Sequence, residues 1–222
     1  MTLVPTQHIV LDIETLGTEI TSVILSAGLC RVMYNTHTGR YEVASEQDCL
    51  YTVFRTVEQL IAGRTVDLAT QQWWSDKSPE AQAVIQQSML ATRPDSVSLS
   101  QVANFITMVT DQKTPAYVEV SIRQLESDTV IWGRGPRFDN NLLGHFFVQM
   151  FGHEPWKFRN DRCLRTIDDM MISHCTHKNE CWHHALHDAI HEAHSLVQVA
   201  NQMLDAGIDF LKFAHSWVKN NG

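Results

Sequence analysis

Residues 9–17, Ile-Val-Leu-Asp-Ile-Glu-Thr-Leu-Gly, constrain this chain more than any other segment. The apolar run that begins at Ile9 is broken at Asp12 and again at Glu14, a pattern typical of a strand. Side chains two positions apart on a strand point to the same face, so the two carboxylates project side by side. Charges that close repel each other unless a cation lies between them, and a hard divalent ion suits oxygen ligands. A strand that reaches the surface, where acids are ordinary, would carry the same residues.

Two later segments carry further residues that a metal site needs. Asp139 lies in Trp-Gly-Arg-Gly-Pro-Arg-Phe-Asp-Asn (132–140), and His183 and Asp188 lie in His-His-Ala-Leu-His-Asp (183–188). The order Asp-x-Glu, then Asp, then His-x-x-x-x-Asp resembles that of the DEDDh 3′–5′ exonucleases of the ribonuclease H-like superfamily. Each motif alone is a weak signal, whereas three motifs in the right order are a strong one.

A narrower subgroup is also similar, namely the small phage exonucleases of the T4 exonuclease A type and the mycobacterial-type exoribonucleases. The similarity extends to Thr-x-x-Trp-Trp at 70–74, to Trp-Gly-x-Gly-x-x-Phe-Asp at 132–139 and to Arg-x-x-Arg-Thr at 162–166. It covers nearly the whole chain. It implies a single exonuclease domain over residues 1–222, with a catalytic core at about 7–207.

The resemblance implies an α/β, ribonuclease H-like fold: a central mixed β-sheet, with three antiparallel strands then parallel strands, flanked by α-helices. The residue patterns agree with it and predict strands at 9–14, 23–34, 42–54 and 128–132. Helices are expected from Pro79 after a Ser78 cap, over 102–109 after a capping box of Ser98 and Gln101, over 140–151, after a cap at Thr166 and Asp169, and over 188–204. Residues 111–127 are expected to form a polar connection.

The catalytic roles are implied by the same resemblance. Two divalent ions, Mg²⁺ or Mn²⁺, would be held by four carboxylates: Asp12 on both ions, Glu14 and Asp188 on the first, and Asp139 on the second. His183 would be the general base that takes a proton from the attacking water. Five residues of helix turn through about 500°, so we expect His183 on a loop and Asp188 at the start of the last helix. The products would be nucleoside 5′-monophosphates, released from the 3′ end.

Contacts with the substrate are also expected from the resemblance. Leu16 would wedge against the terminal base, and the backbone near Thr15 would meet the 3′-OH. One of Trp73 and Trp74 would line the cleft while the other packs in the core, which is the usual place of a helical tryptophan. The expected substrate-binding residues are Thr15, Leu16, Gly17, Trp74, Arg134, Arg137 and Asn140.

The substrate class is single-stranded nucleic acid with a free 3′ end. The phage resemblance slightly favours DNA, and a 3′–5′ exoribonuclease or an oligoribonuclease-like enzyme is the alternative. The net charge of −8 argues against tight duplex binding. Residues 131–165 nevertheless carry six Lys and Arg against three acids, which is enough for a local basic patch. A catalytically decayed binding module is a further alternative, although all five catalytic positions are intact.

Composition fits an enzyme with one sizeable core, at 222 residues and 44% hydrophobic residues. We expect no membrane span and no secretory signal, and free thiols for the five cysteines, as in a cytoplasmic protein. A homodimer is left open. Nine histidines and cysteines crowd residues 174–194, which raises the alternative of a structural zinc site, but their spacing matches no closed zinc pattern.

Overall fold

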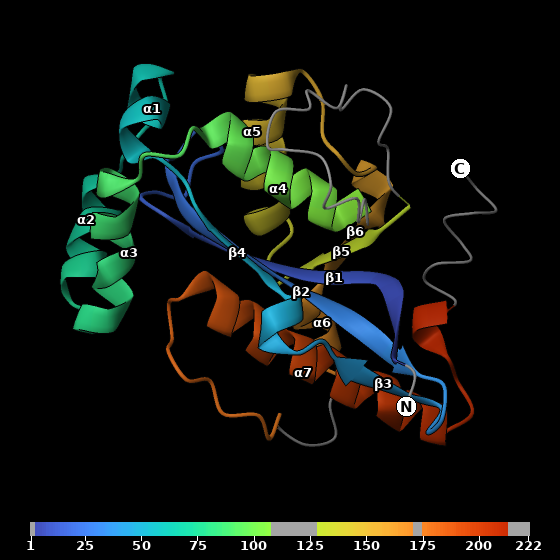
Figure 1. The fold of residues 1–222 in the computed structure, drawn as a ribbon. Coiled ribbons are helices and arrows are strands. Elements are labelled where there is room, and N and C mark those ends of the chain that lie inside the picture. The colour runs from blue at the N-terminus through green and yellow to red at the C-terminus, as the bar shows by residue number, and fades with distance from the viewer. Residues whose placement is uncertain (1–2, 108–127, 171–174, 213–222) are drawn as a thin grey trace.

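A mixed sheet forms the centre of the computed structural model, which describes residues 3–107, 128–170 and 175–212 (Figure 1). Its strand order is β3-β2-β1-β5-β6, and β4 also pairs with β2. Strand β1 is antiparallel to β2 and parallel to β5, so the expected mixed sheet is confirmed. The strands are β1 (Leu3–Thr15), β2 (Ile24–Asn35), β3 (Arg40–Val43), β4 (Leu50–Val53), β5 (Val130–Gly133) and β6 (Asp161–Cys163).

Helices cover both faces of the sheet. In Figure 1, α4 and α5 lie on one face, α7 lies on the other, and α1 to α3 gather beyond one end of the sheet. The helices are α1 (Thr56–Ile61), α2 (Leu68–Ser75), α3 (Pro79–Leu90), α4 (Asp95–Thr107), α5 (Asp139–Phe151), α6 (Leu164–Asp168) and α7 (Ala185–Asp205). No helix of the described part combines the length and the apolar character needed to cross a bilayer.

The alternation of β1 explains why both faces of the sheet are covered. Ile9, Leu11 and Ile13 belong to a core cluster with side chains of α4 and α5. Val10 belongs to a second cluster with residues of α7. Because a strand buried on both faces needs apolar residues at consecutive positions, the run from Ile9 to Leu11 suits the centre of the sheet. Asp12 and Glu14 continue the Val10 face, which is the face that α7 covers.

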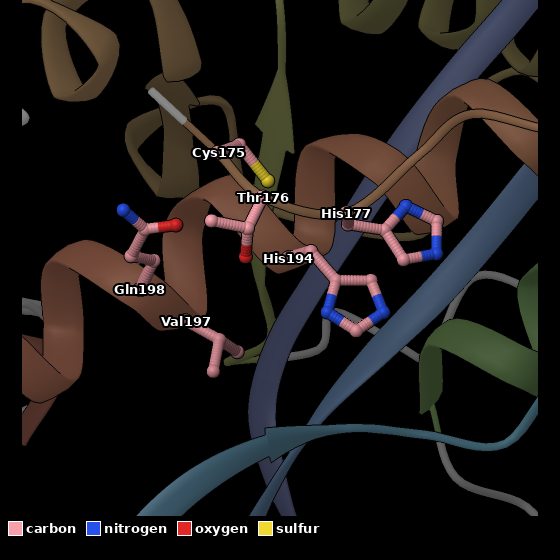
Figure 2. A pocket seen from close by; sticks show the side chains of 6 residues that line it. All are labelled: Cys175, Thr176, His177, His194, Val197 and Gln198. Carbon is pink, nitrogen blue, oxygen red and sulfur yellow. The ribbon is translucent and has the colours of Figure 1, made fainter. Parts of the chain in front are cut away.

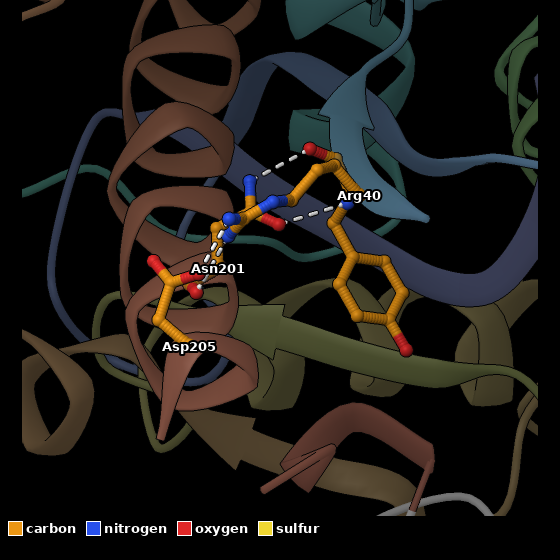
Figure 3. A network of polar contacts seen from close by, with 4 residues as sticks. Arg40, Asn201 and Asp205 are labelled. Atoms are coloured by element: carbon orange, nitrogen blue, oxygen red, sulfur yellow. Dashed lines mark hydrogen bonds and ion pairs between the residues drawn. The ribbon is translucent and has the colours of Figure 1, made fainter. Parts of the chain in front are cut away.

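Polar contacts at the sheet edge hold the C-terminal half of α7 in place (Figure 3). Arg40 on β3 forms an ion pair with Asp205 and donates to the backbone carbonyl of Asn201 at 3.0 Å. The Asn201 amide accepts from the Tyr41 backbone N–H at 2.9 Å and donates to the Tyr41 carbonyl at 2.9 Å. These contacts join α7 to the edge strand.

The third predicted strand, 42–54, is in fact two strands. A 3₁₀ turn (Glu46–Asp48) separates β3 from β4, and both pieces pair with β2, at Val43↔Val32 and Leu50↔Leu29. The Ser45 hydroxyl donates to Asp48 at 2.6 Å within this turn. The backbone N–H groups of Asp48 and Cys49 donate within this turn, to the carbonyls of Ser45 and Glu46, and so do not pair with a neighbouring strand. The prediction of one continuous strand was therefore wrong.

One of the three predicted helix caps is present in the structure. The Ser78 cap with Pro79 as first helical residue is confirmed, because the Ser78 side chain accepts from the Ala81 N–H. The box at Ser98 and Gln101 is wrong: α4 begins at Asp95, and the Ser98 hydroxyl donates to the Val53 carbonyl of β4. The cap at Thr166 is also wrong, since α6 begins at Leu164 and Asp169 follows its end. The polar connection at 111–127 lies outside the described residues.

Candidate active site

Gly28 allows the acidic end of β1 and the start of α7 to meet. It pairs with Asp12 across the β1–β2 ladder. A Cβ atom at Gly28 would lie 2.2 Å from the Ala185 carbonyl oxygen and 2.4 Å from the Leu186 nitrogen. No real side chain fits at those distances, so only glycine lets the first turn of α7 lie directly on β2 beside Asp12.

The first turn of α7 and the loop before it supply the second half of the site. The ligand atoms of Glu14, His183 and Asp188 all lie within 4.8 Å of one another. Asp188 accepts hydrogen bonds from the Asn179 side chain and, at 2.8 Å, from the His183 backbone N–H. Two residues of the preceding loop therefore fix both oxygens of the Asp188 carboxylate. The predicted start of the last helix at Asp188 is wrong by three residues, because α7 begins at Ala185.

His183 lies on the loop before α7, as predicted, and its backbone is unusual. Its φ is 65°, the left-handed region that non-glycine residues seldom adopt, and no other non-glycine residue of the described part has a positive φ. Its imidazole meets the ring of Trp73 edge to face, with centroids 4.7 Å apart. Burial lowers the pKa of His183, and the charge of Asp188 partly opposes this effect. The lowered pKa favours the neutral ring near pH 7.

Asp139 enters the site at the start of α5. Its Oδ2 accepts the Gly135 N–H at 3.1 Å, across the turn that joins β5 to α5. Burial raises the pKa of Asp139 to about 7, although hydrogen bonds from backbone N–H groups lower it. A positively polarised helix N-terminus also favours a carboxylate at this place. The structure therefore brings the acids of all three sequence motifs to one end of β1.

The carboxylates influence one another strongly. Burial raises the pKa of Asp12 well above its usual range, and the charges of Glu14, Glu192, Asp139 and Asp188 add to that rise in this order. Burial and then Asp188 and Asp139 raise the pKa of Glu14 in the same way. The Asp12 Oδ2 is buried and has no hydrogen-bond partner among the described residues. A cation held between these oxygens would remove the repulsion, so the donor set fits Mg²⁺ or Mn²⁺.

Two residues of this site were missed in the sequence. Asn179, 7% exposed, orients Asp188 and lies in a loop segment without any helical or strand period. Glu192, 5% exposed, lies one helical turn after Asp188. Helical periodicity could have found Glu192, because it shares the apolar stripe of Ala185, Ala189 and Ala193.

Trp74 was the tryptophan of α2 expected to contact the substrate, but Trp73 is the exposed one. Trp74 is 1% exposed, and its indole N–H donates to the Thr15 carbonyl at 2.8 Å. Trp73 is 41% exposed and contacts His183. One tryptophan packs and the other is open, as expected, but the assignment of the substrate contact to Trp74 does not fit its burial.

Three other expected substrate contacts have buried side chains or internal partners. Leu16 is 5% exposed and packs in a cluster with Trp74. The Thr15 hydroxyl donates to the Gly17 carbonyl at 2.7 Å, so this turn is held by its own side chain. Asn140 is 1% exposed and donates to Asp161 at 2.7 Å, which ties α5 to β6. The backbone is engaged as well, because the Leu16 N–H donates to the Val23 carbonyl and the Leu16 carbonyl accepts from the Asp67 N–H.

The expected arginine contacts lie at the surface. Arg134 is exposed and pairs with Asp168 at 2.9 Å, which engages part of its charge. Arg137 is also exposed, two residues before Asp139. In the same basic segment, Lys157 pairs with Asp128 at 3.1 Å. The basic patch is therefore partly neutralised by internal ion pairs, and Arg137 is the better candidate for a phosphate contact.

A pocket of about 450 Å³ lies between residues 175–177 and α7, and none of the site acids lines it (Figure 2). His177 and His194 stack face to face there, with ring centroids 4.0 Å apart. Across the described residues, Glu14, His183 and Asp188 are the only three His, Cys, Asp or Glu residues whose ligand atoms lie within 4.8 Å. Cys175 and these histidines do not converge in that way, and His174 lies outside the described residues.

Fold and site together define an α/β protein in which carboxylates and a histidine converge at the end of the central strand. The sequence model of the family described as the 3′–5′ exoribonuclease Rv2179c-like domain matches residues 7–200. The chain therefore belongs to that family, which agrees with the mycobacterial-type resemblance. None of the curated proteins matches the chain.

Proposed function

We propose that this chain is a DEDDh-type 3′–5′ exonuclease with a ribonuclease H-like fold, one domain that shortens single-stranded RNA from its 3′ end. The observation that carries the proposal is the convergence of Glu14, His183 and Asp188 within 4.8 Å, beside the unpartnered oxygen of Asp12. The sequence slightly favoured DNA, but the family is described as exoribonucleases, so we propose RNA in its place.

Asp12, Glu14, Asp139 and Asp188 would hold the cations, and each has a raised pKa that a bound cation would bring down. Two Mg²⁺ or Mn²⁺ ions would activate a water for attack on phosphorus and stabilise charge on the departing 3′ oxygen. Glu14, Asp139 and Asp188 are buried, so little solvent reaches these side chains. The four acids come from β1, α5 and α7, so the site forms only when the chain folds.

His183 would act as the general base. Its ring lies beside Glu14 and Asp188, and its lowered pKa leaves it neutral and able to accept a proton from water. The hydrogen bond from its own N–H to Asp188 and the ring of Trp73 limit where the imidazole can lie. Transfer of one proton to His183 leaves a hydroxide-like nucleophile, and the product is a nucleoside 5′-monophosphate.

Substrate contacts would come from exposed groups around these residues. Trp73 offers a partly exposed indole for base stacking, with the Lys77 ammonium over its ring at 4.0 Å, and Arg137 offers a guanidinium for phosphate. The backbone of Thr15 to Gly17 would meet the terminal 3′-OH, because the side chain of Leu16 is buried. This arrangement serves a single strand, whose bases are free to stack.

The test is digestion of 5′-labelled single-stranded RNA and DNA of matched sequence, with Mg²⁺, with Mn²⁺ and with EDTA. We expect a ladder that shortens from the 3′ end, faster on RNA, absent in EDTA and absent in Asp12→Ala. Faster loss of DNA would contradict the RNA assignment alone. Binding without cleavage under all conditions would contradict the enzyme and favour a decayed module.

A further inference from the structure

Glu192 is an acid on the buried side of α7. It lies four residues after Asp188, so both side chains leave the helix on the same face. That face also carries Ala189 and Ala193, which pack in a cluster with Val10 of β1. A carboxylate among alanines on an apolar stripe is costly unless something in the interior uses its charge.

The direction of Glu192 follows from the packing of α7 on β1. Val10, Asp12 and Glu14 share the face of β1 that α7 covers. With α7 seated on Val10, residues of its first turns extend along that face toward Asp12. The charge of Glu192 raises the pKa of Asp12 more than the charges of Asp139 and Asp188 do, which agrees with this closeness.

The Glu192 carboxylate has an oxygen that no protein group satisfies. Glu192 is 5% exposed, and its Oε2 is buried with no hydrogen-bond partner among the described residues. The positive charge of Arg134 acts on Glu192, but Arg134 already pairs with Asp168 at 2.9 Å. The other charges that act on Glu192 are acidic: Asp139, Asp188 and Asp168. The described surroundings therefore leave this oxygen to a ligand.

We propose that Glu192 is a fifth carboxylate of the cation centre, which strengthens binding of a divalent cation by Asp12 and its neighbours. This inference rests on the proposed function and assigns a role to a residue outside the three motifs. Mg²⁺ keeps several waters when bound to proteins, so Glu192 can act directly or through one of them.

The test is Mn²⁺ binding to the full-length protein, measured by isothermal titration calorimetry after removal of metal with EDTA and dialysis. Glu192→Gln keeps the shape of the side chain and removes its charge. We expect Mn²⁺ affinity to fall by about tenfold or more, the usual effect of losing an outer carboxylate of a metal site. Asp205→Asn is the matched control, since it removes one acid from the exposed end of the same helix, and its Mn²⁺ affinity should equal that of the wild type.

Thermal unfolding of the metal-free proteins separates this role from a structural one. Removing a buried charge should leave the unfolding midpoint of Glu192→Gln at or above that of the wild type. A midpoint well below it, or a failure to fold, would assign Glu192 to packing and overturn the inference. Equal Mn²⁺ affinity of Glu192→Gln and wild type would also overturn it. If the wild type binds no Mn²⁺, the proposed function fails as well, whereas RNA digestion with unchanged Mn²⁺ affinity in the variant overturns the Glu192 role alone.

Discussion

Buried carboxylate oxygens without a hydrogen-bond or ion-pair partner occur in three of the described residues, of which Asp95 lies outside the active site and the other two belong to it. Asp12 and Glu192 each keep one such oxygen. Leaving a buried acceptor unpaired costs about 1–3 kcal/mol, and more when the group is charged. Binding of a cation to these oxygens would offset that loss of stability.

His183 is the residue whose removal should affect chemistry more than cation binding. We expect His183→Ala to lower kcat by about 10²–10⁴-fold, the usual contribution of a general base. Mn²⁺ affinity should fall far less, because the proposed cation ligands are all carboxylates. His37→Ala, in an exposed turn, is the control. Single-turnover digestion of RNA measures the effect, and a His183→Ala rate within threefold of wild type would contradict the general-base role.

Asp139 should make the stability of the metal-free protein depend on pH. Its pKa rises from 3.8 to about 7 on folding, so the folded state binds more protons than the unfolded state between those values. Wild type should therefore lose stability relative to Asp139→Asn as pH rises from about 4 to 7. The histidines are common to both proteins and cancel from this difference. Urea unfolding in EDTA measures it, and a difference that is flat or grows with pH would refute the raised pKa.

At the scale of elements, the contact of α7 with β2 assembles the site. Glycine at position 28 is the condition for that contact, because a Cβ atom would lie 2.2 Å from the Ala185 carbonyl oxygen. The opposite end of α7 is held by Arg40 and Asn201 at the sheet edge. The helix is thus fixed at both ends, and Asp188 and Glu192 are carried to the acids of β1.

Gly28→Ala should displace the first turn of α7. We expect a loss of about 1–3 kcal/mol or more in the free energy of unfolding, because overpacking forces the backbone to shift. Cleavage of RNA should fall even where the variant stays folded. Gly135→Ala is the control for stability, since the nearest atom to its added Cβ is 3.9 Å away. Equal stability and activity of Gly28→Ala and wild type would show that α7 does not approach β2 this closely.

The two tryptophans of α2 should respond in opposite ways to substitution. Trp74→Ala removes a buried side chain and should cost about 3–5 kcal/mol of stability. Trp73→Ala should leave stability nearly unchanged and weaken binding of single-stranded RNA by about 1–3 kcal/mol, the value of one stacked base. Urea unfolding and fluorescence anisotropy measure the two quantities. If Trp74→Ala alone impaired RNA binding, the placement of the two rings would be wrong.

At the scale of the whole molecule, the sequence was most informative where a motif fixes both residue type and spacing. The strand at Ile9, the loop place of His183 and the cap at Ser78 all follow from local patterns, and the structure agrees with them. The split of β3 from β4 did not follow, because it depends on backbone hydrogen bonds within the turn, such as that from the Asp48 N–H to the Ser45 carbonyl. Which of Trp73 and Trp74 is buried depends on how α2 packs, and the two adjacent tryptophans alone do not reveal it.

Charge shows the same limit at this scale. The net charge of −8 counts every acid as ionised. Several of the site acids have raised pKa values, so part of that charge is absent before a cation binds. The basic residues of 131–165 are in turn partly paired, as at Lys157 and Asp128. The electrostatic field at the surface that meets a nucleic acid therefore depends on ion pairs and on cation binding more than on the net charge of the sequence.

Anomalous X-ray diffraction from crystals soaked in Mn²⁺ would locate any cation held by the acids of β1, α5 and α7. We predict anomalous density between Asp12, Glu14 and Asp188, with His183 beside it and Glu192 on its α7 side. Crystals of Asp12→Asn soaked in the same way provide the control and should lose that density. Anomalous density confined to His177 and His194, or no density near Asp12, would show that these acids do not form a cation centre.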